Sequence, residues 1–459
     1  MKIYMVCLGC AKNQADSETV INFFEKSGHE LTFDEREAQA VIIMTCAFIE
    51  QARKEAEETI KEFITKKKRY GFHLLVGGCY AKRFSTIMKE RFPELDAWFG
   101  ISGFEQIGNI LTSVKNGQTG DFTSSPDIVY PEYSGRHLIT PSHWAWLKIA
   151  DGCNHACAFC AIPEIRGSYR SKTIESILRE AQELAENGVK ELLLIAQDTG
   201  LYGKDLYGKV KLVNLLEKLC AIEKIAWIRL LYINPYSLSE ELVDFIAGTE
   251  KMVKYLDIPF QHSSKKILTS MRRPGNGEEY LKLLENMRNK IPDLAVRSSF
   301  IVGFPGETKL DFEELKSFIQ EAKINRAGFF IYSDEEGTTS YSYSDKVSLS
   351  EKNARLDDIA RIQRRISLDI SKQRLGKVLP VIVDSEKSAG LTARLVELFG
   401  NIRLAKGISH IGRTAWDAPE VDGLVFIKTS RKNVLKNGDI VNLKIIKSSV
   451  YDVLGDYSN

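Results

Sequence analysis

Short apolar runs alternate with amphipathic segments of helical length along most of the chain. In residues 1–120 the runs of strand length lie at 2–8, 40–45, 73–77 and 97–99. The segments with helical periodicity that follow them lie at 16–27, 49–68, 86–91 and 104–111. Strands that alternate with helices pair in parallel, because each crossover helix returns the chain to the same end of the sheet. The pattern predicts an α/β domain with a doubly wound parallel sheet over residues 1–120.

The alternation is interrupted once and then begins again. Residues 121–138 are rich in Ser, Thr and Pro and lack helical periodicity, so they are predicted to be a linker. The strands predicted after it lie at 144–150, 191–196, 226–233, 254–259, 295–302 and 327–332. The main helices between them are predicted at 173–186, 212–219, 278–289 and 310–322. Because a closed barrel of this kind needs eight βα units, residues 139–372 are predicted to form a partial (βα)6 barrel with one open side.

The end of the chain has a different character. A long helix is predicted at 349–375, and short β segments follow it at 379–383, 424–428 and 440–446, with glycines between them. Short strands separated by turns that contain glycine are typical of a small barrel. Residues 373–447 are therefore predicted to form an OB-like β-barrel, and residues 448–459 a tail.

The composition limits the classes of protein to which this chain can belong. Lys and Arg (63) nearly balance Asp and Glu (61), so the net charge of +2 gives no overall field that would attract nucleic acid. We expect no membrane span, no signal peptide and a cytoplasmic location, because no uncharged apolar segment has the necessary length. Eight cysteines in 459 residues are too few for a disulfide scaffold. In a reducing compartment, clustered cysteines indicate metal binding or redox chemistry.

Three cysteines lie close together just after the first predicted barrel strand. Cys153, Cys157 and Cys160 have the spacing C-x3-C-x2-C. Three thiolates can hold one face of a 4Fe–4S cluster, which usually takes four, and leave one iron free to bind a small molecule. The alternative is a zinc site formed by the same cysteines with His155 or a more distant histidine. The loop lies at the end of the barrel where active sites form.

Three further cysteines recur in the first domain. Cys10, Cys46 and Cys79 each follow a predicted strand, at intervals of 36 and 33 residues. Ligands bind outside the carboxyl ends of parallel strands, so these loops are expected to converge on a second site with three thiolates. The alternative is that they are small buried apolar residues. Cys7, inside a predicted strand, and Cys220, inside a helical pattern, are interpreted as structural.

The central loop resembles the radical S-adenosylmethionine superfamily. With the three earlier cysteines, the partial barrel and the terminal β-barrel, nearly the whole chain resembles the methylthiotransferase family of that superfamily. The resemblance implies two 4Fe–4S clusters, with S-adenosyl-L-methionine bound at the central one. It also implies that Cys10, Cys46 and Cys79 hold an auxiliary cluster that delivers sulfur, and that the terminal barrel is a TRAM domain.

Five motifs resemble the RimO branch of this family, which modifies an aspartate on small-subunit ribosomal protein twelve. They are Leu8-Gly-Cys-Ala-Lys-Asn13, Thr45-Cys-Ala-Phe-Ile-Glu50, Ala196-Gln-Asp-Thr199, Tyr332-Ser-Asp-Glu-Glu-Gly-Thr338 and residues 417–423. Ala11 and Glu164-Ile165 depart from the usual residues of that branch, and none of them is a predicted ligand. A basic ribosomal protein would be attracted to an acidic surface, which would repel RNA. The acids predicted to form this docking surface are Asp334, Glu335, Glu336, Asp417, Glu420 and Asp422.

The resemblance also implies a mechanism. A deoxyadenosyl radical takes hydrogen from the β-carbon of the aspartate, the auxiliary cluster supplies sulfur, and a second S-adenosylmethionine supplies the methyl group. An external electron donor and a sulfur donor are required. The residues predicted to contact S-adenosylmethionine are Phe159, Gln197, Asp198, Ser299 and Gly303. Two other functions remain open at this point: methylthiolation of an adenosine in transfer RNA, and a non-catalytic protein that binds zinc and RNA.

Overall fold

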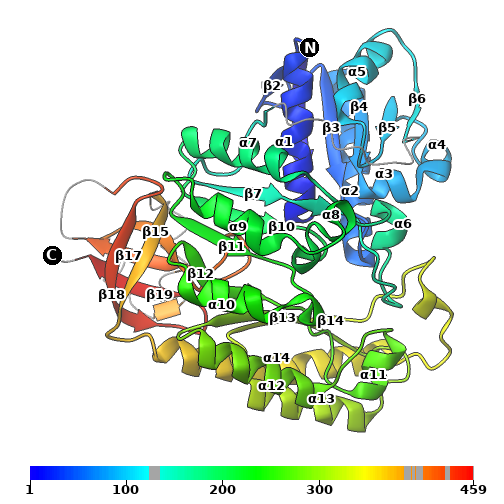
Figure 1. The fold of residues 1–459 in the computed structure, drawn as a ribbon. Coiled ribbons are helices and arrows are strands. Elements are labelled where there is room, and N and C mark those ends of the chain that lie inside the picture. The colour runs from blue at the N-terminus through cyan, green and yellow to red at the C-terminus, as the bar shows by residue number, and fades with distance from the viewer. Residues whose placement is uncertain (124–134, 387–393, 395–397, 400–406, 430–434, 458–459) are drawn as a thin grey trace.

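The computed structural model describes residues 1–123, 135–386, 394, 398–399, 407–429 and 435–457. Three parts follow one another along the chain, as Figure 1 shows in the order blue, green and red. The N-terminal domain and the C-terminal barrel lie on opposite sides of the central partial barrel. Most of the predicted linker lies outside the described residues.

The N-terminal domain contains a parallel sheet in the strand order β2-β1-β3-β4-β5-β6. Its strands are β1 (Lys2–Cys7), β2 (Glu30–Thr32), β3 (Ala40–Thr45), β4 (His73–Gly78), β5 (Ala97–Phe99) and β6 (Gly120–Phe122). Its α-helices are α1 (Ala11–Lys26), α2 (Glu50–Tyr70), α3 (Cys79–Arg83), α4 (Met88–Arg91) and α5 (Ile107–Lys115). The short edge strands β2 and β6 were not predicted, because three residues carry almost no periodicity.

Strand β3 shows why the sheet is covered on both faces. Every residue of β3 is buried. Val41 and Ile43 belong to the apolar cluster under α2, whereas Ile42 and Met44 belong to the cluster under α1 and α5. Successive side chains of a strand point to opposite faces, so a continuous apolar run requires helices on each side. The predicted doubly wound sheet is confirmed.

The central part is the predicted partial barrel. Its parallel strands are β7 (Trp144–Lys148), β10 (Glu191–Ile195), β11 (Trp227–Leu230), β12 (Met252–Asp257), β13 (Ala295–Val302) and β14 (Arg326–Ile331). The outer helices are α7 (Ile174–Glu186), α9 (Leu212–Cys220), α10 (Glu240–Gly248), α12 (Gly277–Lys290) and α13 (Lys309–Ala322). Shorter elements are β8 (Ala150–Asp151), α6 (Ile162–Arg166), β9 (Arg170–Ser171), α8 (Lys204–Tyr207) and α11 (Lys265–Ser270). In the described part of the chain, β7 and β14 do not pair with each other, so the barrel stays open.

Helix α14 (Leu349–Lys372) leads from the partial barrel to a small closed barrel in the strand order β15-β16-β17-β19-β18. Its strands are β15 (Val378–Glu386), β16 (Ile408–Thr414), β17 (Val425–Thr429), β18 (Ile440–Ser448) and β19 (Val453–Tyr457). The predicted boundary at residue 447 is wrong, because β19 pairs with both β17 and β18. Strand β19 lies within the residues that were predicted to be a tail, and it completes the barrel. It was not predicted because it is only five residues long.

The interior of the partial barrel is filled from both neighbouring parts. One apolar cluster joins barrel residues such as Trp146 and Leu193 to Ala15 of α1 and to Ala418 of the loop between β16 and β17. The indole of Trp146 also donates a hydrogen bond to Gln14 of α1 at 2.7 Å. An open barrel exposes apolar surface that must be covered. The flanking domains cover it, and this fixes where α1 lies relative to the barrel strands.

Candidate functional site

The central cysteines lie on a half-buried loop between β8 and α6. The backbone N–H of His155 donates to Cys153 Sγ at 3.4 Å, and Arg273 Nη1 donates to Cys157 Sγ at 3.7 Å. Gly152 precedes the loop with φ 77°, and a Cβ there would lie 2.1 Å from the carbonyl oxygen of Ser168. Glycine therefore lets the loop fold back on β9, and the donors face the sulfur atoms.

Burial controls the charge of these thiols. It raises the pKa of Cys153 to about 11 and that of Cys160 to about 12. Both are therefore neutral near pH 7 in the absence of a bound metal. Binding to iron would have to displace their protons, and the nearby Arg273 cation favours that change.

The structure brings Cys10, Cys46 and Cys79 together. Cys10 follows β1, Cys46 follows β3, and Cys79 begins α3 after β4. The order of the sheet reverses between β1 and β3, which is where open α/β sheets bind ligands. Burial, and next the charges of Cys10 and Cys79, raise the pKa of Cys46 to about 12. A Cβ on Gly9, the residue before Cys10, would lie 3.2 Å from Cys46 Sγ, so the loops that carry Cys10 and Cys46 touch.

Among the described residues, no three His, Cys, Asp or Glu side chains converge as the ligands of one ion do. The thiolates of a cubic cluster bind different irons and need not meet at one point. The three cysteine thiols of each group are the type of donor that holds an iron–sulfur cluster.

Arg166, at the end of α6, contacts both Cys79 and the carboxylate of Asp151 beside the central loop, and it was not predicted. Its guanidinium donates to Asp151 Oδ2 at 2.6 Å, to Asp16 Oδ2 at 3.0 Å and to Cys79 Sγ at 3.5 Å. Asp151 lies two residues before Cys153, and Lys148 pairs with both carboxylates. Burial opposes ionisation of Asp151, but Arg166 and Lys148 hold its pKa well below the usual range. The guanidinium thus fixes one cysteine group relative to the other.

Replacing Arg166 with Gln is expected to uncouple the two sites. The change leaves two buried carboxylates with only Lys148 to balance them, which costs about 3–5 kcal/mol. We expect a lower midpoint of thermal unfolding and less final product for each S-adenosylmethionine cleaved. Arg361→Gln, on the exposed face of α14, is the control and should change neither quantity. An unchanged ratio of product to cleavage in R166Q would contradict this role.

Two predicted cofactor contacts, Gln197 and Asp198, support the loop that carries the cysteines. Asp198 is 1% exposed and accepts hydrogen bonds from His155 at 2.7 Å and Ser237 at 2.6 Å. Its carboxylate therefore orients His155 and is not open to a ligand. Gln197 Nε2 donates to Asp151 at 2.7 Å, while its Oε1 is buried and has no hydrogen-bond partner among the described residues. Gln197 thus holds the carboxylate of Asp151 in place beside the central loop.

The other three predicted contacts have different surroundings. Phe159 is half-buried against the apolar cluster that contains Phe304. Gly303 has φ 71°, and its N–H donates to Glu307 at 2.6 Å in a turn that Arg355 also holds. Ser299 lies in β13, partly exposed. Each remains a candidate for contact with the cofactor, and Gly303 has a structural role as well.

The predicted acidic docking surface is wrong for three of its six members. Glu335 is buried and pairs with Arg53 and Arg83 of the N-terminal domain. Asp417 is buried between Arg326 and Arg374, and Asp422 accepts a hydrogen bond from Tyr255 at 2.7 Å. These carboxylates are paired inside the protein and hold its parts together. The sequence shows that these three residues are acidic, but it does not show which side chains they contact in the folded protein.

The remaining three acids reach the surface. Glu336 and Glu420 are exposed, and Asp334 is half-exposed and pairs with Lys346. Asp334 and Glu336 lie on the loop after β14, and Glu420 lies on the loop between β16 and β17, so these three remain candidates for the docking surface.

Replacing Asp417 with Ala is expected to destabilise the contact between the C-terminal and central barrels. It leaves Arg326 and Arg374 buried without their carboxylate, at a cost of about 3–5 kcal/mol. Urea unfolding followed by tryptophan fluorescence should show a lower midpoint, because Trp416 lies beside the altered residue. Asp369→Ala removes an exposed pair on α14 and should have little effect. Equal midpoints for the two variants would refute the assignment.

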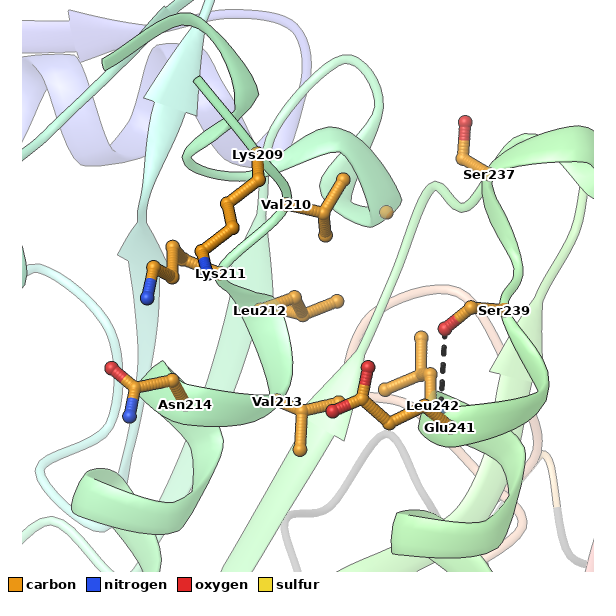
Figure 2. Close-up of a pocket in the computed structure, with 11 residues that line it drawn as sticks. Lys209, Val210, Lys211, Leu212, Val213, Asn214, Ser237, Ser239, Glu241 and Leu242 are labelled. Atoms are coloured by element: carbon orange, nitrogen blue, oxygen red, sulfur yellow. Dashed lines mark hydrogen bonds between the residues drawn. The ribbon is translucent and has the colours of Figure 1, made fainter. Parts of the chain in front are cut away.

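A surface pocket lies on the flank of the barrel between α9 and α10 (Figure 2). Lys209 and Lys211 lie on one side, and Ser239 and Glu241 lie on the other. None of the candidate cysteines lines it. Ser237 on its wall donates to Asp198, so the pocket lies behind the site and does not form part of it.

The described residues contain no helix long and apolar enough to cross a membrane.

Comparison with known families divides the chain as the fold does. Residues 2–100 match Uncharacterized protein family UPF0004, residues 147–319 match the Radical SAM superfamily, and residues 403–457 match the TRAM domain. The fold resembles that of the radical S-adenosylmethionine methyltransferase TsrM from Kitasatospora setae, with a TM-score of 0.53, 14% identity and 72% of each chain covered. Fold and cysteine loop thus define a radical S-adenosylmethionine protein.

Whole-length relatives identify the family. Ribosomal protein uS12 methylthiotransferase RimO from Caldanaerobacter subterraneus subsp. tengcongensis is 40% identical over 453 residues, which are 99% of each chain. RimO from Aquifex aeolicus is 41% identical over 455 residues, and RimO from Thermotoga maritima is 38% identical over the same length, each covering at least 97% of both chains. The chain belongs to the RimO family of uS12 methylthiotransferases. The branch predicted from the five motifs is confirmed.

Proposed function

We propose that this protein methylthiolates the β-carbon of an aspartate on small-subunit ribosomal protein uS12. One observation carries the proposal: Arg166 contacts Cys79 of the N-terminal domain and also Asp151, two residues before the first cysteine of the central loop. A reaction that needs a radical and a sulfur atom at one carbon requires two such sites held together. Identity of about 40% with RimO proteins over the whole chain supports the same reaction.

We further propose that each group of cysteines holds a 4Fe–4S cluster, Cys153, Cys157 and Cys160 the central one and Cys10, Cys46 and Cys79 the auxiliary one. The central cluster with S-adenosyl-L-methionine would supply radical chemistry, and the auxiliary cluster would supply sulfur. The protein orients these groups and excludes water from them. Arg273 donates a hydrogen bond to Cys157, and α1 covers the interior of the barrel at this end.

Other components follow from the proposed reaction. An external electron donor must reduce the central cluster, and a sulfur donor must replenish the auxiliary one. A ribosomal protein substrate is consistent with a cytoplasmic location. Modification of transfer RNA is not favoured, because the whole-length relatives quoted above are all named for uS12.

Mass spectrometry on cells that lack this protein would test the proposal. Ribosomal protein uS12 and transfer RNA from one preparation should be measured together. We expect loss of a methylthio group from the uS12 aspartate alone, and its return when the intact gene is supplied. Loss from transfer RNA alone, or no loss from uS12, would overturn the proposed substrate.

A further inference from the structure

Lys12 is a buried cation at the contact between the N-terminal domain and the barrel. It is the second residue of α1, two residues after Cys10, and is 8% exposed. Its ammonium group stands over the ring of Tyr232 at 3.1 Å from the ring centre. Tyr232 follows β11, so the contact lies at the carboxyl ends of the barrel strands, where the central cysteine loop also lies.

No carboxylate pairs with this ammonium. Among the described residues, Lys12 has no ion pair, and its ammonium group contacts the aromatic ring of Tyr232. The two carboxylates that act on its charge are already paired, Asp151 with Lys148 and Arg166, and Asp257 with Arg297. Burial of a charge is costly unless a partner compensates it, and contact with a ring offsets only part of that cost. The ammonium therefore has capacity to bind an anion that the chain itself does not provide.

Groups from both sites surround Lys12. The ionisable groups close enough to act on its charge include Cys10 of the auxiliary set and Asp151, which precedes the central loop. Tyr232 has φ 61°, a conformation that costs a residue of this type energy and persists where the surrounding structure enforces it. The ring and the ammonium are thus held beside the loop of Cys10, at the end of the barrel where the central loop begins.

We propose that Lys12 binds the carboxylate of the target aspartate and so selects aspartate as the residue to be modified. The inference rests on the proposed function. An ammonium group has three donors, so contact with the Tyr232 ring on one side leaves donors for a carboxylate on the other. A hydrogen bond between two charged groups is stronger than a neutral one. It would hold the β-carbon, which adjoins the carboxylate, between the two sites.

S-adenosylmethionine also carries a carboxylate, and the test must separate the two sources. The cluster-loaded protein, kept free of oxygen, is titrated with purified uS12 that has either the target aspartate or Asn in its place. Wild type is compared with Lys12→Met, which removes the charge, and with Lys12→Arg, which keeps it. Formation of 5′-deoxyadenosine is measured in the same samples.

We expect wild type to bind the aspartate form at least about tenfold more tightly than the Asn form. Lys12→Met should bind both forms equally, Lys12→Arg should retain part of the preference, and all three should cleave S-adenosylmethionine. The matched control is Lys66→Met, because Lys66 also stands over a ring, that of Phe63, but lies on α2 away from the site. It should behave as wild type. Iron content and the midpoint of thermal unfolding establish that each variant is folded and loaded.

Two results would overturn the inference about Lys12 and leave the proposed function standing. One is an undiminished preference for aspartate in Lys12→Met. The other is loss of S-adenosylmethionine binding or cleavage in that variant with uS12 binding intact, which would assign Lys12 to the cofactor. Failure of the wild-type protein to modify uS12 would instead overturn the proposed function, and the inference with it.

Discussion

Replacing Cys157 with Ala is expected to abolish cleavage of S-adenosylmethionine. The proposed central cluster depends on three thiolates from one short loop, and Cys157 is the one to which Arg273 donates. Loss of one thiolate leaves two, too few to hold a cluster with a free iron in place. The loop is half-exposed and Cys is a small residue, so the fold should persist.

Liquid chromatography of 5′-deoxyadenosine measures this effect directly. The variant should form none above background, and its iron content should fall by about half if two 4Fe–4S clusters are present in wild type. Cys220→Ala is the matched control, because Cys220 ends α9 outside both groups and should leave the rate unchanged. Normal deoxyadenosine formation by Cys157→Ala would contradict the assignment of the central site.

Replacing Cys46 with Ala should have the complementary effect: cleavage of S-adenosylmethionine persists, but no methylthio group is added to uS12. Cys46 belongs to the N-terminal domain and lies beside Cys10 and Cys79. The central loop keeps its own contacts with Arg273 and with Arg166 through Asp151. The two sites therefore fail separately, because each takes its cysteines from a different domain.

The measurement is mass spectrometry of uS12 together with deoxyadenosine from the same reaction. Cys7→Ala is the control in the same domain, since Cys7 lies in β1 and its Sγ accepts a hydrogen bond from Ser17. It should retain both activities. Methylthiolated uS12 formed by Cys46→Ala would refute the division of labour between the two groups.

The strands and most helices could be predicted because their pattern is local. Strand β3 is a continuous apolar run and α7 has a clear helical period, so each is readable within a few residues. The meeting of Cys10, Cys46 and Cys79 was also predictable, because parallel strands bring their carboxyl ends to one edge. The exceptions were short elements such as β6 and β19, whose strand conformation depends on pairing with distant neighbours.

The sequence alone determined the α/β architecture and the two cysteine groups, since both follow from spacing along the chain. Only the tertiary structure decided which charges are exposed and which are paired. Arg166 meets Asp16 across 150 residues, and Asp417 meets Arg326 across 91. A charged side chain looks the same in a sequence whether it faces water or a buried partner, because its free energy depends on its surroundings. For that reason the sequence did not show that Asp417 is buried. It also did not show that Lys12 is buried against Tyr232 with no ion pair among the described residues.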